Sequence, residues 1–482
     1  MQSSKLMQLL GELTDEERTN LQQWVFCSLR GRTLGQEACT LLTFLRKHNY
    51  YLDKQWSRER VWRKLFPGQS FRDARMRKIM HELTQFVLDY LGMVHMMSNE
   101  QQLRQATMAV LHERGLEKHY RTLERQSEQF FTSGDQRDHN YHHQRMFLIQ
   151  MQFEREEQSP RRAHLARLLH EQDYHLECYY LIQKLRNYGN SVGNRVFFAF
   201  EGEELQLPNG FLDRIAQGPW IEEVGVRVYW LIAQMLEHPD QESWFYQLKS
   251  LLYSSSHHFS PDEQDSLYIF LKNYCIAYQI NQGKAHYFQE LFEISRTLLE
   301  KGLTQRSGTI EPQAYKNIIT VALHVQEFDW TEQFIREYTR YLPAEDRQNS
   351  LSYNLAKVFF HQGRYGQVIE QLREVAYADH TYALGSKLML LKTYYETGED
   401  RALDSLIDSF RIYLRRNRMI SKEVRDQYRN VLRFVRKLFY LPPNAPEAIA
   451  KLRREIEDCD ALADKPWIMS KVAELSAGSA KA

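Results

Sequence analysis

The stretch LAKVFFHQGRYGQVIEQLREV, residues 355–375, is followed by a second stretch of the same pattern, LLKTYYETGEDRALDSLIDSF, residues 390–410. In both, apolar residues recur every three or four positions on either side of one glycine, Gly363 or Gly398, which is typical of two amphipathic helices joined by a tight turn. The stretches begin 35 residues apart, close to the period of tetratricopeptide repeats. Since one such helix pair cannot bury its apolar face alone, the pattern predicts an all-α, tetratricopeptide-like α-solenoid wound as a right-handed superhelix.

Two less regular helix pairs precede this repeat. Their first helices contain Tyr274 and Ile318 at the position of Leu355, and longer loops at 302–313 and 344–349 account for the uneven spacing. Prolines fall near the edges of helical patterns throughout, as expected of a nearly all-helical chain. We therefore predict a compact helical N-terminal unit at 1–98, irregular helical hairpins at 99–260, the repeats at 261–440 and capping helices at 441–482.

The composition is that of an ordinary folded protein. Hydrophobic residues make up 43% of the 482 residues and charged residues 26%, so neither a disordered nor a fibrous class is indicated. Lys and Arg number 63 against 62 Asp and Glu, so attraction of the whole molecule to nucleic acid or anionic lipid is not expected. The five cysteines are scattered without a Cys-x-x-Cys motif, and no apolar run approaches membrane-spanning length. We therefore expect a cytoplasmic protein without a membrane partner.

The repeats place polar side chains at equivalent positions of their first helices. First helices of such repeats line the concave groove, where amides and ammonium groups suit the backbone and the carboxylates of an extended peptide. The candidate peptide-binding residues are Lys272, Asn273, Lys316, Asn317, Asn354, Lys357 and Lys392. The alternative is that these side chains only solvate or cap helix ends.

Three short segments, YKN at 315–317, YNLA at 353–356 and LMLLKTYYE at 388–396, carry a resemblance to known proteins. They are similar to an uncharacterised family of bacterial helical-repeat proteins known mainly from the Bacteroidota, and the similarity extends over most of the chain. The resemblance implies a helical-repeat fold and no known activity.

The N-terminal region supports a second interpretation. Residues 46–90 carry eleven Lys or Arg and five Asp or Glu, a net charge of +6. The motif VWRKLFP within them and the helix that follows resemble the winged-helix domains of some bacterial regulators, which implies that Arg72, Arg75 and Lys78 approach DNA phosphates. At most one strand, at 92–98, follows where a wing has two. The alternative function is a DNA-associated transcriptional regulator, although basic helices are more often solvated faces.

Motifs for catalysis or metal binding are weak. Residues 189–193 match Gly-x-Ser-x-Gly, but the preceding segment predicts a helix where a hydrolase has a strand, so we interpret them as a helix terminus. Metal-capable side chains at helical spacing or nearby are Asp138, His139, His142, His143, His164, His170 and His175. Surface histidines on a solvated helix are the simpler interpretation. We expect no enzymatic activity, small-molecule substrate, cofactor or metal, and predict a non-enzymatic scaffold or adaptor with a protein or peptide partner.

Overall fold

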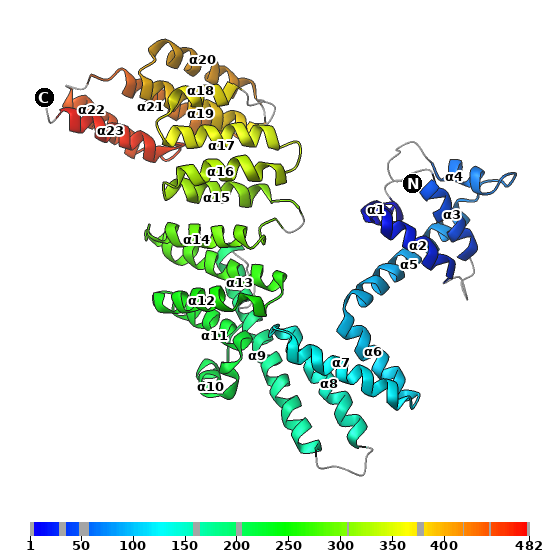
Figure 1. Ribbon diagram of the computed structural model, residues 1–482. Helices are drawn as coiled ribbons and strands as arrows, with labels where there is room; N and C mark the ends of the chain where they lie inside the picture. The colour runs from blue at the N-terminus through cyan, green and yellow to red at the C-terminus, as the bar shows by residue number, and fades with distance from the viewer. Residues whose placement is uncertain are drawn as a thin grey trace. The chain divides into compact units, whose positions relative to one another are not determined.

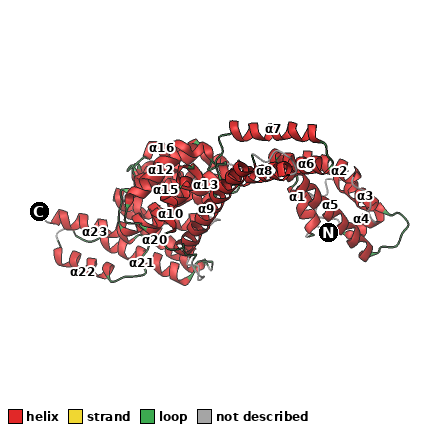
Figure 2. Ribbon diagram, turned by 90° about the horizontal axis from the view of Figure 1, so that it is seen from below, coloured by secondary structure: helices red, strands yellow, loops and turns green. Residues whose placement is uncertain are grey.

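The computed structural model describes residues 4–27, 35–47, 57–157, 164–198, 205–305, 308–373, 380–417, 419–442 and 445–479. Every regular element in these residues is helical, as Figures 1 and 2 show, so the prediction of an all-α protein is confirmed. None of these helices combines the length and the apolar composition that crossing a bilayer needs.

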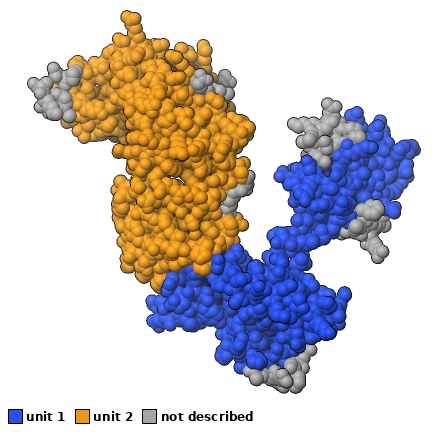
Figure 3. All heavy atoms as spheres, in the orientation of Figure 1, with its two compact units in different colours: residues 1–186, 213–229 blue, residues 187–212, 230–482 orange. Residues whose placement is uncertain are grey.

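The chain divides into two compact units, which Figure 3 colours separately. The first unit consists of Met1–Arg186 and Asp213–Tyr229, and the second unit consists of Asn187–Leu212 and Trp230–Ala482. The boundary between them falls within three helices, α9 (Leu165–Phe198), α10 (Phe211–Gln217) and α11 (Val224–Glu237). The four regions predicted from the sequence stay a prediction.

The first unit begins with five helices around one apolar core. These are α1 (Lys5–Glu12), α2 (Asp15–Cys27), α3 (Gly35–Lys47), α4 (Arg58–Leu65) and α5 (Asp73–Ser98). On α5, buried Ile79, Leu83 and Phe86 recur at three- and four-residue spacing, as an amphipathic helix requires. The helix continues through 92–98, so these residues supply no strand of a wing.

Further helices of the first unit follow α5. They are α6 (Glu100–Glu113), α7 (Glu117–Ser133), α8 (His139–Glu157), the first part of α9, α10 (Phe211–Gln217), the short helix Pro219–Glu222 and the start of α11. The Gly-x-Ser-x-Gly segment lies inside α9, which continues to Phe198, so our interpretation of it as a helix terminus is wrong. A Cβ atom on Gly189 would lie 3.1 Å from the Phe270 ring, so this glycine allows close helix packing.

The second unit is a succession of helix pairs. After α12 (Glu242–Ser255) and the turn Ser256–His258 come α13 (Pro261–Asn273), the π-helix Tyr274–Gln279, the 3-10 turn Ile280–Gln282 and α14 (Tyr287–Glu300). The next helices are α15 (Pro312–His324), α16 (Phe328–Tyr338) with the turn Thr339–Tyr341, α17 (Arg347–His361), α18 (Tyr365–Arg373), α19 (His380–Thr397) and α20 (Asp400–Arg416). The chain ends with α21 (Lys422–Phe439), α22 (Pro446–Glu457) and α23 (Lys465–Ser479).

Consecutive helices from α14 to α21 contact one another, and Figure 1 shows α14 to α17 stacked in chain order. The first helices also meet directly, because α15 contacts α17 and α17 contacts α19. Tyr353 of α17 fits over Gly385 of α19, where a Cβ atom would come within 2.4 Å of the tyrosine oxygen. We call the surface carrying Lys272, Lys316, Lys357 and Lys392, one residue from each first helix, the first-helix face.

Each pair turns at a residue with positive φ. Gly283, Gly363 and Gly398 have φ of 89°, 70° and 69°, and the turn between α15 and α16 has Gln326 with φ 63°. Glycine adopts this left-handed conformation without steric cost, whereas a side chain makes it strained. Gln326 is therefore the weak position in an otherwise glycine-based series of turns.

Replacing Gln326 by glycine is expected to raise the free energy of unfolding by about 0.5–1 kcal/mol, because the relief of left-handed strain exceeds the added freedom of the unfolded chain. The reverse change at the equivalent turn, Gly363→Gln, should lower it by about 1 kcal/mol. Urea unfolding followed by circular dichroism measures both. A lower urea midpoint for Gln326→Gly would contradict this account of the turns.

Candidate functional site

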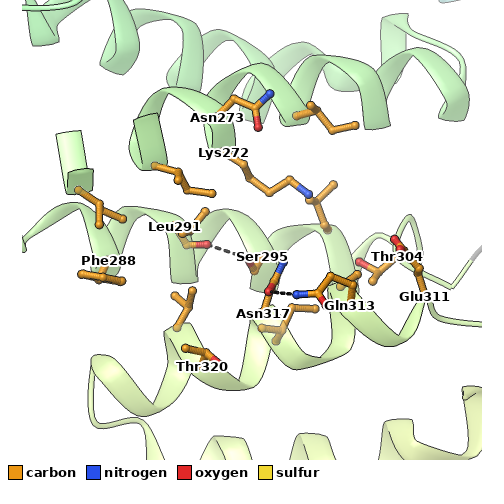
Figure 4. A pocket seen from close by; sticks show the side chains of 17 residues that line it. Lys272, Asn273, Phe288, Leu291, Ser295, Thr304, Glu311, Gln313, Asn317 and Thr320 are labelled. Carbon is orange, nitrogen blue, oxygen red and sulfur yellow. Dashed lines mark hydrogen bonds between the residues drawn. The ribbon is translucent and has the colours of Figure 1, made fainter. Parts of the chain in front are cut away.

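A pocket of about 580 Å³ lies on the first-helix face between α13, α14 and α15 (Figure 4). Three of the seven predicted peptide-binding residues line it: Lys272 and Asn273 from α13 and Asn317 from α15. Most of the remaining lining is apolar and includes Ile269, Ile276, Leu291, Leu298, Ile318 and Val321. The structure therefore brings together polar groups that are more than forty residues apart in the sequence, over an apolar floor.

The π-helix that follows α13 shapes one wall of this pocket. Two hydrogen bonds stabilise its wide turn: the Gln279 amide and the Tyr274 hydroxyl both donate to the Pro239 carbonyl, at 3.0 and 2.8 Å. Ile276 and Ile280 consequently reach the pocket. Such π-helical turns occur frequently at functional sites.

Lys272 is the only lysine lining the pocket in the part of the chain that the structure describes. Burial lowers the pKa of its ammonium group, and Asp265 opposes the change. The Asn317 carboxamide oxygen accepts a hydrogen bond from Gln313 at 2.9 Å, which leaves its NH₂ group available to a ligand. An ammonium group and amides above apolar side chains suit a peptide with a carboxylate and an apolar side chain.

Lys316, Lys357 and Lys392 form a row across α15, α17 and α19. The Lys316 ammonium lies 5.2 Å from the centre of the Tyr382 ring, and the Lys392 ammonium lies 4.8 Å from that of Phe360. Burial lowers the pKa of Lys357, and the positive charges of Lys392 and Lys316 lower it further. The Lys357 ammonium is thus close enough to both Lys316 and Lys392 for their charges to repel it.

Sequence reasoning missed the residue that pairs with Lys392. The Lys392 Nζ atom lies 2.7 Å from Oδ2 of Asp464, which precedes α23 and has a left-handed φ of 51°. The Trp467 indole N–H donates to Glu396 at 3.1 Å, and Lys471 pairs with the same carboxylate at 2.8 Å. No spacing in the sequence relates these residues, because 71 or more positions separate the two sides.

One predicted site residue is not available to a partner. Asn354 is 2% exposed, and its amide donates to the backbone oxygen of Ser350, one turn earlier in α17, at 2.8 Å. Asn354 occupies the same repeat position in the sequence as Asn273 and Asn317, but its side chain is buried whereas theirs line the pocket. We therefore remove Asn354 from the candidate site and assign it to the packing of α17.

The three predicted DNA-contacting residues lie at the start of α5. Arg72 precedes the helix, Lys78 is exposed, and Arg75 pairs with Glu37 of α3 at 2.5 Å, which raises the Arg75 pKa through hydrogen bonding. Asp73 in the same turn accepts ion pairs from two further arginines. Acidic side chains therefore offset part of this basic face.

The histidine-rich segment differs from expectation, because two of its members are buried. His142 is 0% exposed and His175 is 7% exposed, and their Nδ1 atoms lie 2.9 Å apart, so one neutral ring donates to the other. Burial lowers the pKa of His142 to about 3 and that of His175 to about 4. Asp138 accepts a hydrogen bond from the Tyr141 backbone at the start of α8. Within the described residues, no group of His, Cys, Asp or Glu is arranged to hold a metal ion.

Comparison with known proteins identifies no family. No family model, curated protein or solved structure matches the chain. The functional assignment therefore depends on the geometry of the first-helix face.

Proposed function

We propose that this protein is a non-enzymatic scaffold, built as a right-handed tetratricopeptide-like solenoid, that binds an extended segment of a protein partner on its first-helix face. The observation that carries the proposal is the convergence of Lys272, Asn273 and Asn317 over one apolar pocket. A cytoplasmic location and kinship with the Bacteroidota repeat family belong to the same proposal.

The chemistry of the pocket favours a peptide over a small hydrophilic ligand. Asparagine side chains donate to and accept from a peptide backbone, and the Lys272 ammonium suits a carboxylate. The apolar floor, with Leu291 and Leu298 from α14, takes an aliphatic or aromatic side chain. A partner segment therefore combines an apolar anchor with a nearby acidic residue.

Selection from a random peptide display library with the full chain as bait tests this proposal. We expect enrichment of peptides that share an apolar residue close to Asp or Glu. A double variant, Lys272→Gln with Asn317→Leu, should lose the shared motif, because it removes an ammonium group and an amide from the pocket.

Arg296→Gln is the matched control, since Arg296 is exposed on α14, does not line the pocket and pairs with Glu300 on the same helix. It should enrich the same motif as the wild type. Failure of the wild type to enrich any motif, or enrichment of one motif by both the wild type and the pocket variant, would overturn the proposal.

A further inference from the structure

One lysine of the row beyond the pocket, Lys392, is already paired with a carboxylate of the same chain, that of Asp464. Asp464 reaches Lys392 from outside the repeats, and the same ammonium lies 5.1 Å from the Trp467 ring centre. Trp467 in turn packs edge-on against Tyr395 of α19, with ring centres 5.4 Å apart. The segment from Asp464 to Lys471 thus lies on the last part of the first-helix face as a bound segment would.

Two lysines of the row lack such a partner. Neither Lys316 nor Lys357 forms an ion pair or hydrogen bond with a carboxylate among the residues the structure describes, and the Lys316 ammonium lies over the Tyr382 ring. Glu396 does not neutralise them, because Lys471 and Trp467 occupy its oxygens. Asp464 therefore pairs with Lys392 alone, and within the described residues Lys316 and Lys357 have no carboxylate partner on a half-buried surface.

We propose that the segment Asp464–Lys471 is a built-in occupant of the first-helix face, which holds Lys392 and leaves Lys316 and Lys357 as the binding pair for a carboxylate of an acidic partner segment. This inference rests on the proposed scaffold function and names the partner chemistry of a second point on the same face. An acidic side chain placed between the two ammonium groups relieves their mutual repulsion and forms charge-assisted hydrogen bonds, which are stronger than neutral ones.

The segment Asp464–Lys471 also weakens binding of an acidic partner. Asp464 takes the ammonium of Lys392, whose positive charge acts on Lys357. Its left-handed backbone, φ 51°, is one that asparagine also tolerates, so Asp464→Asn removes the charge without new backbone strain. Removing the charge frees Lys392 and is expected to strengthen binding of an acidic peptide.

Fluorescence anisotropy with a labelled hexaglutamate peptide and the full chain at low ionic strength measures both effects. Lys357→Gln and Lys316→Gln should each weaken binding about tenfold or more, the effect of losing one charge-assisted contact. Asp464→Asn should tighten binding by about threefold to tenfold. Lys387→Gln is the control, because it removes the same charge from α19 where the ammonium lies over the Phe410 and Tyr413 rings of α20; it should change affinity less than about twofold.

Absence of hexaglutamate binding to the wild type, or equal binding by Lys357→Gln, overturns the inference. Unchanged or weaker binding by Asp464→Asn, with the circular dichroism spectrum intact, overturns the role of the occupant. The pocket variants separate this result from the proposed function: a display motif that depends on Lys272, together with no hexaglutamate binding, leaves the scaffold proposal standing and removes only the lysine pair. If no display motif is enriched but hexaglutamate binding depends on Lys357, the lysine pair stands and the peptide-binding pocket is removed.

Discussion

Acidification from pH 8 to pH 5 is expected to destabilise the first unit much more in the wild type than in the double variant His142→Asn, His175→Asn. The two buried rings share one hydrogen bond between their Nδ1 atoms, which requires one ring to accept. Asparagine reproduces a donor and an acceptor near the Nδ1 position but does not gain a proton in this range. The variant therefore removes the titration while retaining a polar pair.

The direction follows from the pKa values. Burial, the partner His175 and Arg137 lower the pKa of His142 to about 3, and burial and Arg145 lower that of His175 to about 4 against the opposing charge of Glu171. In the unfolded chain both titrate near 6.5. The contribution of the two neutral histidines to the free energy of unfolding is therefore fully present above about pH 6.5. It is lost as the pH falls, because the unfolded state binds protons that the folded state does not bind. By pH 5 the loss for two histidines is about 4 kcal/mol.

Urea midpoints at pH 8 and pH 5 measure this loss. His170→Asn is the matched control, since His170 is an exposed residue of α9, and it should keep the wild-type pH dependence. An equally steep decline in the double variant would show that other groups cause the acid sensitivity.

A second large effect is expected for Gly225→Ala, which should lower the free energy of unfolding of the first unit by about 2–3 kcal/mol. A Cβ atom at Gly225 would lie 2.6 Å from the backbone oxygen of Arg137 and 2.9 Å from Cδ1 of Ile182. The backbone oxygen cannot rotate away as a side-chain tip can, so α11 must shift from the loop before α8 that carries Arg137. The melting temperature should fall by about 5–10 °C.

Gly92→Ala provides the control for helix propensity. Gly92 lies in α5 with no heavy atom within 4 Å of the added methyl group, so alanine should stabilise the helix by about 0.5–1 kcal/mol. Differential scanning calorimetry of the two variants gives shifts of opposite sign if contact, and not propensity, decides the result at Gly225. A neutral Gly225→Ala variant would show that α11 is free to move.

The sequence was sufficient to predict the helices but not which side chains of different helices contact one another. Apolar spacing and the turn glycines, such as Gly363 and Gly398, depend on local geometry, so the helix pairs were predictable. Lys272 and Asn317 were predictable as candidates because repeats place equivalent residues on one face. Equivalent side chains need not be equally exposed to solvent, and the burial of Asn354 is why it was assigned wrongly to the candidate site.

Long-range pairs gave no sequence signal. His142 lies at helical spacing from Asp138, yet its partner is His175 on the next helix, and the choice depends on how α8 and α9 pack. The contact between Lys392 and Asp464 depends in the same way on how the chain after α21 returns to α19. Physical reasoning from one sequence identifies which residues carry charge, but not which of them tertiary packing brings together.

The return of the C-terminal segment to α19 also bears on how this protein can vary in length. Repeat proteins gain and lose whole units, because each unit contacts only its neighbours. A helix pair duplicated between α16 and α17 would keep the contacts of Asp464, Trp467 and Lys471 with α19, whereas one added after α20 would place another first helix beneath α23. On the proposed repeat architecture, the protein should therefore tolerate an added helix pair upstream of α17 better than one downstream of it.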